Sequence, residues 1–238
     1  IFNTMETISI HRPKIVVIGS CNTDMVVKAN RLPVPGETIL GGTFYMNPGG
    51  KGANQAIAAA RLGAEVTFIS KIGYDLFGLQ ALEIYRSEKI NTEYIFTDQK
   101  SPSGVALISV DSFGENSIIV APGASRSLSI EDINKAEEKI KEADIILMQL
   151  EIPIDTVEYA ATIACKYGKK VILNPAPASS LSNSFLRNVH TILPNRIEAE
   201  MLSGIKVMNI ESAHRAAQAI GEKGIENVVI TLGKDGAY

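Results

Sequence analysis

The chain has 238 residues, of which 45% are hydrophobic and 21% charged, and its formal net charge is −3. This composition is typical of a globular protein with a buried core, and the mildly acidic balance argues against nucleic acid as a partner. No apolar run reaches the roughly 20 residues of a membrane-spanning helix, and two distant cysteines exclude a disulfide scaffold and favour the cytoplasm.

Residues 1–13 show no secretory signal and are predicted to be an N-terminal extension of an α/β domain at residues 14–238. In this domain short β-branched apolar runs alternate with helical patterns. The runs lack polar alternation, as expected for strands buried on both faces of a parallel sheet. We therefore predict a three-layer α/β/α fold with a mostly parallel sheet. The predicted strands are Ile15–Ile18, Val66–Ser70, Ile145–Leu150, Val171–Leu173, Thr191–Leu193 and Val228–Leu232.

The segments between these runs are predicted to be helices. Ser129 and Asp132 form a capping pair at the start of one helix, whose apolar stripe continues to Ala143. Asp155 is predicted to cap another, which ends before Gly168. The remaining predicted helices are Ala53–Leu62, Leu76–Ser87, Ile197–Ser203 and Ser212–Lys223.

Two stretches, at about residues 24–46 and 94–120, interrupt the alternation with strand patterns and turns. We predict that they form one small antiparallel lid over a site, with mere surface hairpins as the alternative. At the other end, Gly233–Gly236 is predicted to be a hairpin turn, and only two residues follow it. Because a hairpin needs a returning strand, the chain is expected to be a fragment, incomplete at its C-terminal end.

Polar clusters follow the strand ends, where open α/β sheets bind their ligands. Asn22 and Asp24 lie two residues apart, so in extended backbone they share one face and suit the adjacent hydroxyls of a sugar. An Asx turn is the alternative. In Asn47–Ala56, three glycines precede an alanine-rich helix with Asn54 in its first turn. They favour close approach of a ligand to the backbone, or close helix packing.

Two further clusters leave alternatives open. Glu151 ends a buried strand and is either a ligand group or a helix cap. Asn195 ends another strand, and Glu198 lies one helical turn later. This pair suits the water shell of Mg²⁺ near phosphates, although a capping box explains it equally well. The Thr231–Gly236 loop offers a hydroxyl and backbone freedom for phosphate oxygens, or it is an ordinary hairpin.

In their order along the chain, from about Lys14 to Tyr238, these clusters resemble those of the ribokinase-like (PfkB) carbohydrate kinases, and in particular the ribokinase branch. The motifs that carry the resemblance are Gly19–Asp24, Pro35–Thr38, Gly49–Ala56, Met148–Glu151, Asn174–Ala178, Pro194–Asn195 with Glu198, and Thr231–Gly233.

The resemblance implies transfer of the γ-phosphoryl group of ATP to a sugar hydroxymethyl group, with D-ribose as the first candidate acceptor. Mg²⁺ would be a cofactor, as would a monovalent cation (K⁺) in the full-length protein. The lid would exclude water and form a homodimer interface. By the same resemblance the sugar is held by Asn22, Asp24, Gly50, Lys51, Gly52, Asn54 and Glu151. ATP contacts Asn195, Thr231, Gly233 and Gly236, and Glu198 positions Mg²⁺ through water.

One departure bears on catalysis. The family's catalytic Asp lies in a Gly-Ala-Gly-Asp motif, which does not occur up to Tyr238, and Asp235 lies in the wrong context to replace it. The general base is therefore expected beyond Tyr238, and this 238-residue chain is expected to be inactive. The alternatives are a kinase for another sugar or a nucleoside and a non-catalytic sugar-binding module. A nicotinamide oxidoreductase lacks support, because no glycine fingerprint follows the first strand.

Overall fold

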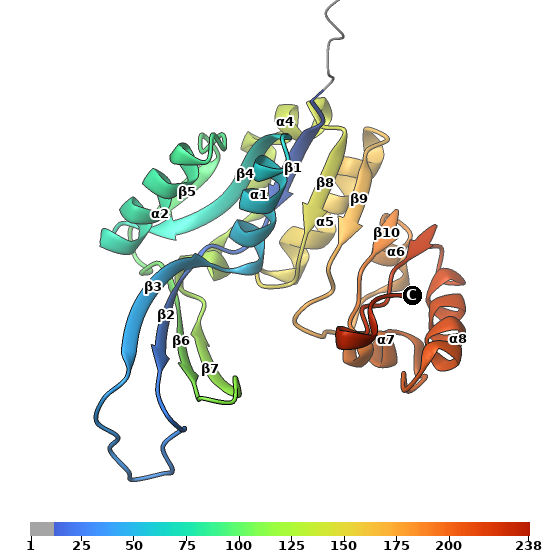
Figure 1. The fold of residues 1–238 in the computed structure, drawn as a ribbon. Helices are drawn as coiled ribbons and strands as arrows, with labels where there is room; N and C mark the ends of the chain where they lie inside the picture. The colour runs from blue at the N-terminus through green and yellow to red at the C-terminus, as the bar shows by residue number, and fades with distance from the viewer. Residues whose placement is uncertain (1–11) are drawn as a thin grey trace, which may run out of the picture.

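The computed structural model describes residues 12–238, which form a seven-stranded sheet and a separate four-stranded sheet (Figure 1). Most of the extension predicted at 1–13 lies outside the described residues. All neighbours in the large sheet are parallel, in the order β11-β10-β9-β8-β1-β4-β5. Its strands are β1 (Lys14–Ile18), β4 (Glu65–Gly73), β5 (Ile95–Asp98), β8 (Ile145–Met148), β9 (Lys170–Leu173), β10 (Thr191–Ile192) and β11 (Asn227–Val228).

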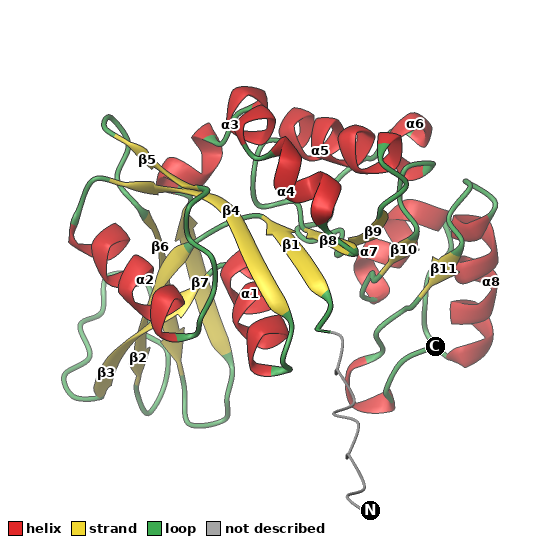
Figure 2. Ribbon diagram, turned by 90° about the horizontal axis from the view of Figure 1, so that it is seen from above, coloured by secondary structure: helices red, strands yellow, loops and turns green. Residues whose placement is uncertain are grey.

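Helices cover both faces of the large sheet, which confirms the three-layer prediction (Figure 2). Figure 2 shows α1 and α2 on one side of β1 and β4 and α3, α4 and α5 on the other. No helix in the part of the chain that the structure describes is long and apolar enough to cross a membrane. The helices are α1 (Lys51–Arg61), α2 (Leu76–Ser87), α3 (Ile130–Lys135), α4 (Glu137–Glu142), α5 (Ile154–Lys166), α6 (Asn183–Leu186), α7 (Arg196–Ser203) and α8 (Ile210–Gly221).

The four-stranded sheet, here called the small sheet, projects from the carboxyl edge of the large one (Figure 1). Its order is β3-β2-β6-β7. The prediction of an antiparallel sheet is wrong for one pair of strands, because β2 and β6 run parallel to each other. The predicted lid stretch at 94–120 also begins too early, since β5 pairs with β4 in the large sheet. The strands of the small sheet are β2 (Asn22–Lys28), β3 (Thr43–Gly49), β6 (Gly104–Val110) and β7 (Asn116–Ala121).

Two helix predictions need correction. The predicted capping box of Ser129 and Asp132 is present, but the helix it starts is divided at Ala136, where a tightened turn bonds the Ala136 N–H to the carbonyl of Ile133. Ile133 and Ile140, one on each side of the break, are both fully buried. Asp155 does not cap α5. The N-cap residue is Pro153, whose fixed φ suits a helix start, and Asp155 lies in the first turn.

The predicted hairpin at the C-terminal end is present. A 3₁₀ helix, η2 (Gly233–Asp235), forms its turn. The backbone of Tyr238 returns to Ile230 with hydrogen bonds of 2.9 Å in both directions. The last two residues therefore do pair with the preceding segment, which the sequence pattern alone did not predict.

Candidate functional site

The N-terminal end of α1 packs directly on the loop that follows β1. Gly50 is the N-cap residue, with a φ of 88° that favours glycine, and the Ala53 N–H donates to the carbonyl of Ser20 at 3.0 Å. A Cβ on Gly52 would lie 2.7 Å from backbone atoms of Gly19 and Ser20. The close-packing interpretation is therefore correct for Gly52. This packing unites the first two polar clusters of the sequence.

Glu151 holds the first turn of α1 from the end of β8. Its Oε2 accepts from the Lys51 N–H at 2.8 Å and from the Ser20 hydroxyl at 2.5 Å, and its Oε1 pairs with Lys51 Nζ at 3.1 Å. The carboxylate thus satisfies a free N–H group at a helix N-terminus, where negative charge is favoured. Glu151 caps α1, which is 100 residues distant in sequence, rather than the helix that follows it.

Asn22 and Asp24 lie on the same face of β2, as predicted. The Oδ1 atom of Asn22 is buried and has no hydrogen-bond partner, and the carboxylate of Asp24 lies where a side chain on Gly49 would clash with it. Burial is the main cause that raises the pKa of Asp24, and the negative charge of Glu151 raises it further while Lys51 opposes the shift. Within residues 12–238 no hydrogen-bond donor reaches these oxygens, so a ligand with hydroxyl groups suits them.

Beside this centre lies a cavity of about 480 Å³ at the carboxyl ends of the large-sheet strands. It brings the predicted sugar residues Lys51 and Asn54 together with Asn195, Glu198 and Thr231 from the predicted nucleotide and metal group. Gly233 and Gly236 are not among its lining residues. They lie in the exposed hairpin turn, where the Asp235 carboxylate pairs with the Arg196 guanidinium at 2.8 Å. The cavity is lined by Lys51, Asn54, Gln55, Asn174, Ala176, Leu193, Asn195, Glu198 and Thr231.

Asn195 and Glu198 form the capping box that was the alternative to a metal role. Glu198 Oε2 accepts from the Asn195 N–H at 2.7 Å, Oε1 accepts from Nδ2 at 2.9 Å, and Asn195 Oδ1 accepts from the Glu198 N–H. Each carboxylate oxygen keeps a lone pair for water in the cavity. Among the described residues no three His, Cys, Asp or Glu side chains cluster as direct metal ligands. The residues therefore fit Mg²⁺ held through water.

The list of predicted site residues omits Gln55 and Asn174, which also line the cavity. Asn174 follows β9 as Asn195 follows β10, so the rule of strand ends would have included it. Gln55 lies one residue beyond Asn54 in α1, and its Oε1 accepts from the buried side chain of Gln149. A sequence pattern carries no signal for that contact.

Comparisons with known proteins identify the family of this chain. The model of the pfkB family carbohydrate kinases matches residues 12–238. A ribokinase of Haemophilus influenzae is 46% identical over 227 residues, which cover 95% of this chain and 74% of that protein. A deoxyribokinase of Salmonella typhimurium is 39% identical over 224 residues, covering 94% and 73%.

A solved structure of Arabidopsis thaliana ribokinase complexed with ribose and ATP superposes with a TM-score of 0.84 at 31% identity, covering 95% of this chain and 74% of that one. The family match spans the whole described length. The chain therefore belongs to the PfkB family of carbohydrate kinases.

Proposed function

We propose that the full-length protein phosphorylates the hydroxymethyl group of a pentose, with D-ribose as the acceptor and ATP as the donor. The observation that carries this proposal is the position of Asn22 and Asp24, two oxygen-bearing side chains that lack protein donors, beside the Lys51–Glu151 pair. The adjacent cavity carries Asn195, Glu198 and Thr231 on its wall. Ribokinases of Haemophilus influenzae and Staphylococcus aureus, at 46% and 42% identity, support ribose as the sugar.

In this proposal the chain's residues bind and orient rather than react. Asn22 and Asp24 accept hydrogen bonds from sugar hydroxyls, and Lys51 keeps positive charge at the boundary between sugar and phosphate. Glu198 and Asn195 hold water around Mg²⁺, which when bound neutralises phosphate charge. The one carboxylate that lines the cavity, Glu198, has both oxygens bonded to Asn195. As the family resemblance implies, we assign the general base and the K⁺ site to residues beyond Tyr238.

The test compares the full-length protein with this 238-residue chain. Full-length protein with ATP and Mg²⁺ is expected to phosphorylate ribose with a higher kcat/KM than deoxyribose, fructose or adenosine. The 238-residue chain is expected to bind ribose in calorimetry without turnover. A higher kcat/KM for deoxyribose would reassign the acceptor, as the similarity to the Salmonella typhimurium deoxyribokinase would suggest. Turnover by the shorter chain would contradict the missing base, and ribose binding without turnover by the full-length protein would indicate a sugar-binding module.

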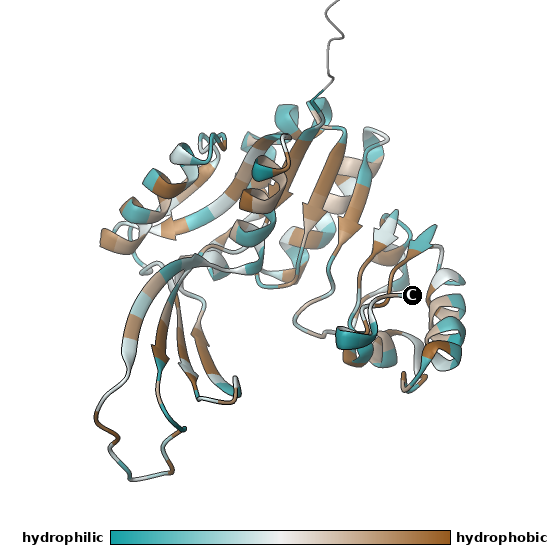
Figure 3. Cartoon of the chain, in the orientation of Figure 1, coloured by the Kyte–Doolittle hydropathy of each residue, from teal (hydrophilic) through white to brown (hydrophobic). Residues whose placement is uncertain are grey.

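We further propose a homodimer formed through the small sheet. Pairing register places Phe44, Leu107 and Ile119 on one face of this sheet, where they are 58%, 54% and 69% exposed. The small sheet projects from the large one, and Figure 3 colours several stretches of its strands as hydrophobic (Figures 1 and 3). An exposed apolar face of this kind marks an interaction surface.

Sedimentation of the full-length protein at micromolar concentration is expected to show a dimer, and the Leu107→Glu/Ile119→Glu double variant a monomer. Leu62→Glu is the control, since Leu62 is 89% exposed at the end of α1 and outside the small sheet. A monomeric parent protein, or a dimer that survives the double substitution, would contradict the proposed interface.

A further inference from the structure

A cluster of hydrogen bonds centred on Asp75 holds the chain just before β6 begins. Asp75 is the N-cap of α2, and its Oδ1 accepts from the Gly78 N–H at 2.9 Å. The same carboxylate accepts from the Ser103 N–H through Oδ2 and from the Ser103 hydroxyl through Oδ1, both at 2.7 Å. The Ser103 hydroxyl in turn accepts from the Gly73 N–H at 3.0 Å. One carboxylate thus joins the end of β4, the start of α2 and the start of β6.

The backbones at this junction are packed without room for side chains. A Cβ on Gly73 would lie 2.3 Å from the Ser103 nitrogen, and one on Gly78 would lie 2.4 Å from the Gly73 carbonyl oxygen. Contacts this close leave the segment around Ser103 little freedom to move relative to the large sheet while the hydrogen bonds are intact. The sequence signal is Gly73-x-Asp75-x-x-Gly78, which none of the predicted sugar, nucleotide or metal positions includes.

The residue after Ser103 contacts the predicted sugar site. Gly104 pairs with Asn22 across β6 and β2, and a Cβ on Gly104 would lie 2.1 Å from Asn22 Oδ1. This Oδ1 is the buried oxygen that has no protein partner. The position of the Asn22 amide therefore depends on the position of Gly104, which follows the residue that Asp75 binds.

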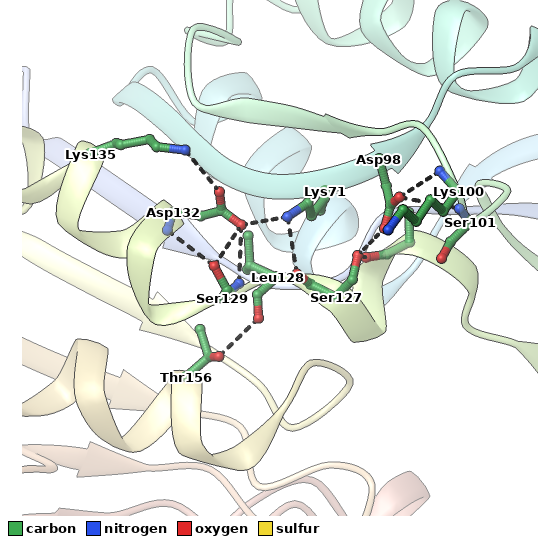
Figure 4. Close-up of polar contacts among 11 residues, drawn as sticks. Lys71, Asp98, Lys100, Ser101, Ser127, Leu128, Ser129, Asp132, Lys135 and Thr156 are labelled. Atoms are coloured by element: carbon green, nitrogen blue, oxygen red, sulfur yellow. Dashed lines mark hydrogen bonds and ion pairs between the residues drawn. The ribbon is translucent and has the colours of Figure 1, made fainter.

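Further contacts hold the other end of the β6–β7 hairpin (Figure 4), and the Ala124 N–H also joins it to the Pro102 carbonyl at 2.8 Å. The 3₁₀ helix η1 (Gly123–Ser127) follows β7, the second strand of the hairpin. Lys71 Nζ donates to the Ser127 carbonyl at 3.1 Å and to Asp132 at 2.7 Å, and the Ser127 hydroxyl donates to Asp98 at 2.5 Å. These groups bind η1 to β4, β5 and α3. Loss of the Asp75 contacts would thus release Ser103, next to Gly104, while the preceding residues stay bound to Asp98 and Ala124.

We propose that Asp75 is a positioning residue for the sugar site: its carboxylate fixes Ser103, just before β6 begins in the small sheet, and thereby positions Gly104 against Asn22. This inference rests on the proposed sugar-kinase function. Asp75 itself makes no contact with substrate. Its contribution is expected in sugar binding, with little effect on the phosphoryl-transfer step once sugar is bound.

The main test is Asp75→Asn in the full-length protein. The amide oxygen retains the α2 cap, since Asn is as good an N-cap as Asp. The amide NH₂ replaces the oxygen that accepts from the Ser103 N–H, so two donors face each other and this hydrogen bond is lost. We expect the sugar KM to rise about tenfold, the order of a buried hydrogen bond to a charged group, with kcat and the KM for ATP nearly unchanged. Ser103→Ala, which keeps the Ser103 N–H bond to Asp75, is expected to raise the sugar KM less.

The control for a purely structural role is Asn209→Ala, which removes the capping box of α8 far from the small sheet. It is expected to lower the melting temperature at least as much as Asp75→Asn while leaving the sugar KM unchanged. Equal sugar KM values for Asp75→Asn and the parent would overturn the proposal and reduce Asp75 to a helix cap.

Hydrogen exchange supplies a readout that does not depend on kinase activity. In sugar-free Asp75→Asn protein, amides of Gly104–Val110 are expected to exchange faster than in the parent, while those of α8 (Ile210–Gly221) stay unchanged. Unchanged exchange in both segments would contradict the positioning role. A parent protein that phosphorylates no sugar, yet shows the expected exchange pattern, would refute the proposed function and leave the β6 junction established.

Discussion

Gly52→Ala is expected to destabilise the protein by about 3 kcal/mol, the upper part of the range for overpacked interiors. In an open helix position the same substitution stabilises, because glycine weakens a helix by about 0.5–1 kcal/mol relative to alanine. At Gly52 the new Cβ would lie 2.7 Å from the Gly19 carbonyl carbon and from the Ser20 nitrogen and oxygen. These are backbone atoms, so α1 would have to move away from the loop after β1. Sugar binding should fall as well, since Lys51 moves with the helix.

Gly221→Ala is the matched control. Gly221 is the last residue of α8, its φ is not positive, and a Cβ there would meet no atom within 4 Å. We expect a gain of about 0.5 kcal/mol from the higher helix propensity of alanine. Urea denaturation of both full-length variants measures the two changes, which should have opposite signs. A Gly52→Ala protein as stable as the parent would show that α1 and the β1 loop are not in the close contact described.

Most of the fold could be predicted because the strands of the large sheet are buried on both faces and stand out as apolar runs. The exception is β5, a four-residue edge strand in which only Ile95 is buried. Its neighbours in sequence, β6 and β7, belong to the small sheet, whereas β5 pairs with β4. The parallel pairing of β2 with β6 was missed for a related reason. Strand pairing across dozens of residues is a tertiary property that local patterns do not encode.

In the candidate site, too, local patterns predict some residues, whereas others depend on tertiary contacts. The rule of strand ends located Lys51, Asn54, Asn195, Glu198 and Thr231, and these residues do line one cavity. It could not show that Glu151 caps α1, because that contact joins residues 100 positions apart. Nor could it identify Asp75, whose partner Ser103 lies 28 residues later. Candidate ligand-binding residues can be recognised from their place near a strand end, whereas residues that hold others in position can be recognised only from contacts.

Asp24→Asn is expected to lower sugar affinity about a hundredfold, because two hydrogen bonds from sugar hydroxyls would lose their charged acceptor and each is worth about 1.5–3 kcal/mol before compensation. Stability should not fall. The pKa of Asp24 is raised by burial and by the charge of Glu151, so the native state disfavours the ionised form. Removing that charge should therefore leave the free energy of unfolding equal or slightly higher. Glu200→Gln, an exposed change of equal charge inside α7, is the control and should alter neither property.

The same carboxylate makes sugar affinity and stability depend on pH in opposite directions. Because the folded pKa of Asp24 lies above its ordinary value, this group adds stability as pH falls through the folded pKa, since the protonated form is the favoured one. Sugar affinity falls over the same range, because the protonated carboxyl is a weaker acceptor. Calorimetric titration of the parent should show this loss of affinity at a higher pH than an exposed Asp would give. Asp24→Asn should bind weakly and without pH dependence there, and a pH dependence that survives the substitution would belong to another group.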